Sequence, residues 1–133
     1  MHLKIITHDR IVFDEDVNEI YTKGVDGEFG ILKGHIPVVS ALDIGVTKVV
    51  QNDICKFFTT MGGIFQFKND EATILTDTAE DGSDIDITRA KAAKERAEAR
   101  LAEKNANVDV KRAEAALSRA LARLKTAMVS TQK

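Results

Sequence analysis

The sequence has few of the residues from which small proteins build covalent or metal-bound frameworks. Its 133 residues include one cysteine, Cys55, which excludes an internal disulfide and a thiolate metal cluster. The three histidines lie at no metal-ligand spacing. No apolar run approaches the roughly 20 residues that a membrane-spanning helix needs, and the first six residues are too short an apolar segment for a signal peptide. If the protein works at a membrane, another molecule must hold it there.

Glycine, proline and aromatic residues are all missing from residues 85–133. This part contains 13 alanines and carries 12 Lys and Arg residues against 6 Asp and Glu residues, a net charge of +6. Residues 1–84 carry 7 basic and 15 acidic residues, a net charge of −8. A shift this complete predicts two parts of different architecture, 1–84 and 85–133.

The first part has the pattern of short strands separated by polar turns. Residues 51–53 and 69–70 have the composition of hairpin turns. We expect strands at 3–7, 11–13, 17–23, 27–32, 38–42, 46–50, 54–60, 64–68 and 71–76. Strands of this number and spacing predict an antiparallel β-sandwich or flattened barrel.

Two acidic segments of this part are interpreted as solvated chain. Asp14–Asp16 has no further ligand nearby in the sequence, so a turn is favoured over a metal site. Residues 77–84 are expected to form a linker or hinge. Ser83 or Asp84 is then placed to cap the helix that follows.

From Ile85 onward nothing in the sequence breaks a helix until residues 104–107, after which Val108 or Asp109 begins a second one. Apolar residues recur at helical spacing in both segments: Ala90, Ala93, Ala97 and Leu101, then Val110, Ala113, Leu117, Leu121, Leu124 and Met128. Two helices with a short joint predict an antiparallel hairpin. Because alanine buries little surface, we expect the hairpin to dock weakly and to be able to move.

Arginines repeat on each expected helix with steps of seven and four residues. They are Arg89, Arg96 and Arg100 on the first helix and Arg112, Arg119 and Arg123 on the second. Three interpretations remain open: two solvated faces, phosphate binding by guanidinium groups, or docking on an acidic partner.

The segment Gly27–Pro37 contains three glycines and the only proline. It is interpreted as a short strand that ends in a shaped turn and presents His35, with Glu28 upstream. The alternative is an ordinary sheet corner with a surface histidine.

Several segments together resemble the epsilon subunit of the F-type ATP synthase, and the resemblance covers nearly the whole chain. They are Gly27–Leu32 with Gly34–Pro37, then Met61–Phe65, Asp84–Ala90, Lys111–Glu114 and Arg119–Leu124. Lys33 departs from the proline often found at that position in the family. The resemblance implies a bacterial-type subunit without catalysis of its own, in the rotor of an ion-translocating complex.

The resemblance also implies partners. The sandwich would sit at the foot of the central stalk against the gamma subunit and the c-ring, with Glu28 and His35 towards the ring. The hairpin would fold on the sandwich, or extend along gamma to the alpha and beta subunits and inhibit ATP hydrolysis through Arg112, Arg119 and Arg123. The complex would place the chain peripherally at the cytoplasmic face of the bacterial membrane.

In some bacterial members of this family the folded hairpin binds ATP as a regulatory ligand, and no cofactor or metal is required. The resemblance carries that site onto Glu80, Ile85, Asp86, Arg89, Ala90, Arg119 and Arg123. Arg96 and Arg100 are candidates for one further arginine. Asp86 and Arg89, three residues apart, could instead simply pair with each other at the helix start.

The residues themselves show no phosphate-binding loop with a Lys-Ser/Thr ending and no nucleophile–base pair, so no catalytic residue is assigned. A different class of function is a module that binds nucleic acid or an acidic partner through its basic helices. Nucleic acid is disfavoured, because the aromatic residues lie in the acidic part, whose charge repels phosphate. A free-standing nucleotide sensor without partners is a third alternative.

Overall fold

The computed structural model describes residues 1–103 and 109–131 of the chain, which form a β-sandwich followed by two helices. The strands are β1 (His2–Ile6), β2 (Ile11–Asp16), β3 (Glu19–Gly24), β4 (Gly27–Leu32), β5 (Val38–Gln51), β6 (Ile54–Lys68), β7 (Glu71–Leu75) and β8 (Ala79–Asp81). A 3₁₀-helix, η1 (Gly82–Asp84), leads into α1 (Ile87–Ala102) and α2 (Val110–Thr131). The predicted fold class is confirmed.

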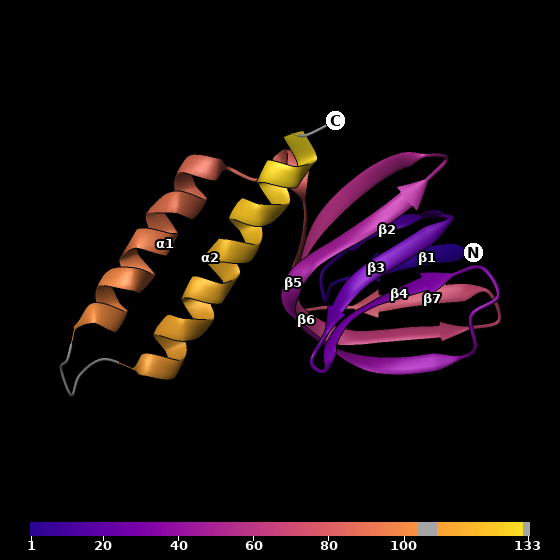
Figure 1. Cartoon of the computed structure of the whole chain (residues 1–133), viewed down its shortest axis with the longest axis horizontal. Coiled ribbons are helices and arrows are strands. Elements are labelled where there is room, and N and C mark those ends of the chain that lie inside the picture. The colour runs from indigo at the N-terminus through magenta and orange to yellow at the C-terminus, as the bar shows by residue number, and fades with distance from the viewer. Residues whose placement is uncertain (104–108, 132–133) are drawn as a thin grey trace.

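One continuous sheet builds the sandwich by folding over itself (Figure 1). Its strand order is β2-β1-β7-β6-β5-β3-β4, and β8 pairs with β6 outside this path. Every pairing is antiparallel except β1 with β7, which is parallel. The predicted antiparallel sandwich therefore contains one parallel pair, because β1 lies between β2 and β7 and runs in the same direction as β7.

Three strands are longer than predicted, and one of them is β2, which includes Asp14–Asp16, the segment expected to be a turn. The expected strands 38–42 and 46–50 are one strand, β5, and the expected strands 54–60 and 64–68 are one strand, β6. Gly62 and Gly63, with φ of 75° and 114°, let β6 bend without ending. A Cβ on Gly63 would lie 1.9 Å from the Leu75 carbonyl oxygen, so a side chain is excluded at this bend.

The predicted hairpin turns at 51–53 and 69–70 are present. Asn52 and Asp53 have φ of 50° and 66°, and Asn69 and Asp70 have φ of 53° and 63°. Two successive residues with positive φ form the turn whose twist matches a β-hairpin, and Asn and Asp tolerate this conformation best after glycine.

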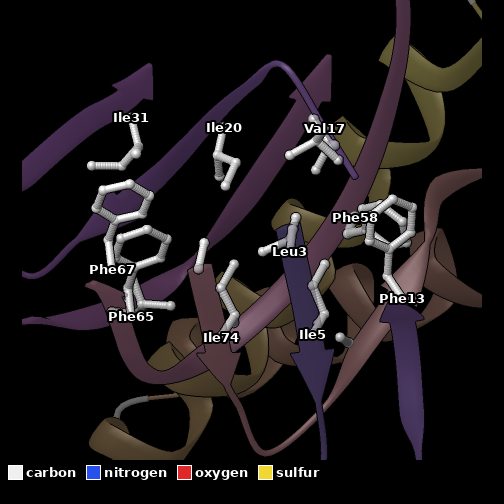
Figure 2. Packing of buried hydrophobic residues seen from close by; sticks show 14 residues of the cluster. Leu3, Ile5, Phe13, Val17, Ile20, Ile31, Phe58, Phe65, Phe67 and Ile74 are labelled. Carbon is white, nitrogen blue, oxygen red and sulfur yellow. The ribbon is translucent and has the colours of Figure 1, made fainter. Parts of the chain in front are cut away.

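The core lies between the two layers of the sandwich (Figure 2). Phe13 and Phe58 meet edge to face at one end, with ring centroids 5.4 Å apart. Phe65 and Phe67 lie near Ile31 at the other end, and Leu3, Ile5 and Ile74 fill the middle (Figure 2). All of the buried residues of this cluster precede β8 or lie in it, so the sandwich has a core independent of the helices.

Residues 77–84, expected to be a linker, are instead largely packed structure. Residues 79–81 form β8, which pairs with Phe58–Thr60 of β6. Asp81 caps η1 by accepting from the Ser83 N–H at 3.0 Å. The acidic composition predicted solvent exposure, but buried Ala79 and buried Gly82 anchor the segment to its neighbours. The caps proposed for the first helix, Ser83 and Asp84, were wrong, and Asp86 has that role.

The two helices lie side by side, with α2 between α1 and the sandwich (Figure 1). The predicted joint at 104–107 lies outside the described residues. Asp109 accepts from the Arg112 N–H at 3.0 Å and begins α2, as one of the two predicted starts. Within the described ranges, neither helix is long and apolar enough to cross a membrane.

Small residues bring α2 close to the sandwich. The Thr59 hydroxyl of β6 donates to the Thr126 hydroxyl at 2.8 Å, and both residues are fully buried. A Cβ on Gly82 would lie 1.9 Å from the Ser130 Oγ. This contact relies on close backbone approach rather than on large apolar side chains, which agrees with the alanine-rich pattern of the sequence.

Candidate functional site

A pocket of about 470 Å³ lies where the start of α1, the β8–η1 segment and the middle of α2 meet. We call it the arginine pocket. It is lined by Glu80, Asp84, Ile85, Asp86, Arg89, Ala90, Ala93, Arg96 and Arg123. Six of the seven residues that the family resemblance assigned to ATP are among them, although they come from three separate elements.

Asp86 orients the start of α1. It has an extended backbone, with φ of −79° and ψ of 104°, and its carboxylate accepts from the Arg89 N–H at 3.0 Å. This N-cap satisfies a backbone donor that the helix itself leaves free. Asp86 therefore bonds to the backbone of Arg89. In the described part of the chain the pair forms no side-chain ion pair, so the simple pairing considered from the sequence is not the arrangement found.

The helical period then places further residues of α1 along the pocket wall. Arg89, Ala93 and Arg96 are spaced by four and three residues, which aligns them on one face. Buried Ala90 lies beside them, on the side that packs into the protein. The small alanine side chains leave space for a ligand between the two guanidinium groups.

The opposite wall comes from β8 and α2 through one ion pair. The Arg123 Nε donates to the Glu80 Oε1 at 2.9 Å, and each side chain is about 30% exposed. This bond fixes the position of Arg123 in the pocket and also joins α2 to the sandwich. Since both groups remain in contact with water, we assign the pair at most about 1 kcal/mol of stability.

The charges of the arginine pocket balance formally. Arg89, Arg96 and Arg123 oppose three carboxylates, those of Glu80, Asp84 and Asp86. Two of the carboxylates already accept hydrogen bonds, from Arg123 and from the Arg89 backbone. In the described ranges, the guanidinium groups of Arg89 and Arg96 take part in no ion pair. They are therefore available to an anionic ligand, and Ile85, Ala90 and Ala93 offer it an apolar surface.

The arginines predicted on α2 do not all reach the pocket. Arg123 lines it, whereas Arg119, one turn earlier, does not, although the resemblance assigned both. Arg112 lies exposed in the first turn of α2. Arg96 and Arg100 of α1 were the two candidates for one further arginine of the site. Arg96 lines the pocket and Arg100 does not, so the structure favours Arg96.

Two pocket residues were missed by sequence reasoning. Ala93 carries a signal, since it lies four residues after Arg89 on the predicted apolar stripe of the helix. Asp84 carries none, because its place depends on how η1 turns into α1. Within the described residues, no group of three or more His, Cys, Asp or Glu side chains is arranged to hold a metal ion.

The structure does not bring Glu28 and His35 together. Glu28 is near the start of β4, where it lines a surface groove together with Lys125 of α2. His35 follows the other end of the strand, where its ring meets Phe67 edge to face at 6.1 Å between centroids. At about 3.3 Å per residue, the rest of β4 separates them by roughly 13 Å or more. They form two separate surface features rather than a polar pair.

Comparisons with known proteins cover both parts of the chain. Residues 1–82 match the family model described as the ATP synthase delta/epsilon chain beta-sandwich domain, and residues 83–128 match that of its long alpha-helix domain. A protein of Euglena gracilis mitochondrial ATP synthase, solved with OSCP, F1 and the c-ring, has the same fold. It superposes with a TM-score of 0.82 at 24% identity, over 95% of this chain and 79% of that one.

Curated relatives agree with the family models. The ATP synthase epsilon chain of Desulforamulus reducens is 46% identical over 101 residues, which is 74% of this chain and 75% of the relative. The epsilon chain of Lawsonia intracellularis is 44% identical over 101 residues, 76% of each chain. With both family models matched in order and a sandwich that leads into two helices, the chain belongs to the ATP synthase epsilon chain family.

Proposed function

We propose that this chain is a non-catalytic rotor subunit of an F-type ATP synthase, in which its sandwich couples the c-ring to the catalytic head and its helices regulate ATP hydrolysis. Membership of the epsilon family supports the role in the complex. The division into a sandwich with its own core and a hairpin that rests on it supports the regulatory role. The subunit would act at the cytoplasmic face of a bacterial membrane, held there by the complex.

An exposed apolar row on the sandwich supports docking on the gamma subunit. Cross-strand partners align along it from β5 to β2, namely Ala41, Ile64, Leu75, Ile6 and Ile11. Ile64, Leu75 and Ile11 are 48%, 49% and 57% exposed. The row spans five strands, or about 19 Å, which matches roughly 13 residues of a helix laid across the sheet. A helix of gamma is the occupant we propose.

We propose that the loop that carries His35 contacts the c-ring. Glu28 would make a second contact, at a different point on the surface of the sandwich. The loop is exposed and follows β4 at the end of the strand away from Glu28. A contact that used both residues would have to extend along the whole of β4.

The observation that supports a regulatory ligand most directly is the convergence of six of the seven expected residues on the arginine pocket. Three guanidinium groups from two helices face one volume, and those of Arg89 and Arg96 form no ion pair among the described residues. ATP would bind these groups through charge-assisted hydrogen bonds to its phosphates. Ile85 and Ala90 would contact the base, and Asp86 could accept from the base or the ribose.

Binding in this place would couple the ligand to the position of the hairpin. Because the pocket exists only while α2 lies against β8, ATP would stabilise the folded form and oppose an extended, inhibitory one. A ligand at about 100 times its dissociation constant adds about 2.7 kcal/mol to the state that binds it. In the extended form Arg112, Arg119 and Arg123 would be free to contact the alpha and beta subunits.

Calorimetry of the isolated chain with ATP tests the regulatory proposal. We expect heat of binding and a higher melting temperature, both strongly reduced in Arg89→Ala and Arg123→Ala. Arg112→Ala is the matched control, since Arg112 lies outside the pocket, and it should bind as the unmodified chain does. No heat and no rise in melting temperature with millimolar ATP would exclude ATP sensing by this chain while leaving its place in the rotor unaffected.

A further inference from the structure

A second pocket lies on the other side of α2, in the seam between this helix and the sandwich. It has a volume of about 390 Å³, within the range of small-molecule sites, and we call it the seam pocket. Its apolar wall is formed by Tyr21, Phe29, Val46 and Phe57 of the sandwich and by Val129 of α2. The sandwich and α2 each form part of this wall, so the pocket would be lost if α2 moved away from the sandwich.

Tyr21 is held in place over a glycine in this wall. Tyr21 and Gly30 are cross-strand partners on β3 and β4. A Cβ on Gly30 would lie 2.7 Å from the Tyr21 ring, so only glycine leaves room for the ring to lie there. The Tyr21 hydroxyl donates to the Glu19 Oε1 at 2.6 Å, which fixes the far end of the side chain. The wall is thus preformed.

The charges at the seam pocket sum to one excess positive charge. Lys48 of β5 and Lys125 of α2 contribute ammonium groups, and Glu28 of β4 contributes a carboxylate. Lys48 lies 5.6 Å from the centroid of the Tyr21 ring. Among the described residues, Lys125 and Glu28 form no ion pair. A ligand with a single negative charge complements this set, whereas a polyanion would be repelled by Glu28.

Among the described residues, the seam pocket and the arginine pocket have no lining residue in common. Arg123 and Lys125 are two positions apart on α2, which corresponds to a rotation of about 200° around the helix. The two pockets therefore lie on opposite sides of the same helix, and a ligand in one need not touch a ligand in the other.

We propose that the seam pocket binds a small amphiphilic monocarboxylate, such as a medium-chain fatty acid, and that this ligand holds α2 against the sandwich. The apolar body would lie along Tyr21, Phe57 and Val129, and the carboxylate would lie between Lys48 and Lys125. Because the wall comes from both parts of the chain, binding stabilises the docked hairpin independently of any ligand in the arginine pocket.

Titration of the full chain with decanoate, followed by calorimetry and melting temperature, tests this proposal. We expect saturable binding and a higher melting temperature. Decanol lacks the charge and decyltrimethylammonium reverses it, so both should bind at least about tenfold more weakly. Lys125→Gln and Lys48→Gln should each weaken decanoate binding by about tenfold, and Glu28→Gln should strengthen it.

Two matched variants complete the test. Lys91→Gln removes an exposed lysine of α1 that lies outside the seam pocket, and Arg89→Ala removes a residue of the arginine pocket. Both should bind decanoate as the unmodified chain does. The proposal is overturned if millimolar decanoate does not bind, if decanol binds equally well, or if Lys125→Gln and Lys91→Gln have the same effect.

Discussion

Thr59 of β6 and Thr126 of α2 are joined by a hydrogen bond of 2.8 Å between their hydroxyl groups, in a contact with no exposed surface on either residue. Thr126 in turn donates to the Ala122 carbonyl oxygen at 2.7 Å, within its own helix. The sandwich and the hairpin thus meet through a buried polar contact. Such a contact is stable while it is complete and costly when only one partner remains.

The first prediction concerns the cost of removing only one partner of this hydrogen bond. Thr126→Val should lower the stability of the docked hairpin by about 1–3 kcal/mol, because it leaves the Thr59 hydroxyl buried without its acceptor. Thr59→Val combined with Thr126→Val should recover most of the loss, since both polar groups are then removed. Hydrogen exchange of the α2 amides measures the effect. Equal losses in the single and double variants would show that the bond does not hold the helix.

Gly82→Ala should displace α2 from the sandwich. The added Cβ would lie 1.9 Å from the Ser130 Oγ and 2.8 Å from the Thr126 carbonyl oxygen, and the second atom belongs to the helix backbone. We expect rapid proteolysis of the helices with the sandwich left intact. Adding Ser130→Ala removes the contact with the Ser130 Oγ but leaves those with the Thr126 carbonyl oxygen and, at 2.9 Å, the Ser130 Cβ, so it should restore docking only in part. Full protection of α2 in Gly82→Ala would contradict the close approach.

The stability of the sandwich should depend on pH through His2. Its Nδ1 bonds to the Asp16 Oδ1 at 2.7 Å and its Nε2 bonds to Asp14, and these hydrogen bonds, Asp16 first, raise the pKa of His2 above its ordinary value of 6.5. The charged histidine is thus favoured in the folded state. Its contribution is fully present below about pH 6.5 and is lost as pH rises through the higher folded pKa.

Melting temperatures measured from about pH 5.5 to 8.5 test this dependence on His2. His2→Gln should flatten the profile in the range above pH 6.5. His8→Gln is the matched control, because His8 is exposed and forms no ion pair in the described part of the chain. An unchanged profile in His2→Gln would assign the pH dependence to other groups.

Truncation after Ser83 should leave a folded sandwich. Of the residues that the structure describes, none beyond Ala79 belongs to the core cluster, so the contacts within the cluster remain in the truncated chain. We expect one cooperative thermal transition, assembly with the rotor and faster ATP hydrolysis by the complex, since the proposed inhibitory helices are absent. Failure to assemble would mean that the helices are structural, and unchanged hydrolysis would place any inhibition elsewhere.

The sequence predicted most residues of the candidate site, but not which arginine of α2 would line it. Asp86, Arg89 and Ala90 lie within one helical turn, so their proximity follows from local structure. Arg119 and Arg123 are four residues apart and occupy nearly the same face of a helix. Which of them reaches the pocket depends on the position of α2 along its axis, and the contacts of Thr126 with Thr59 and of Ser130 with Gly82 set that position.

The sequence alone determined the features that depend on short-range physics. The Asn-Asp turns tolerate positive φ, and the run without glycine or proline permits two alanine-rich helices after the change of charge at residue 85. Only the tertiary structure decided that β5 and β6 are continuous, that residues 79–81 pair with β6, and that Glu28 and His35 lie apart. These outcomes depend on which distant strands pair and on how closely α2 approaches them, and neighbouring residues in the sequence do not encode such long-range choices.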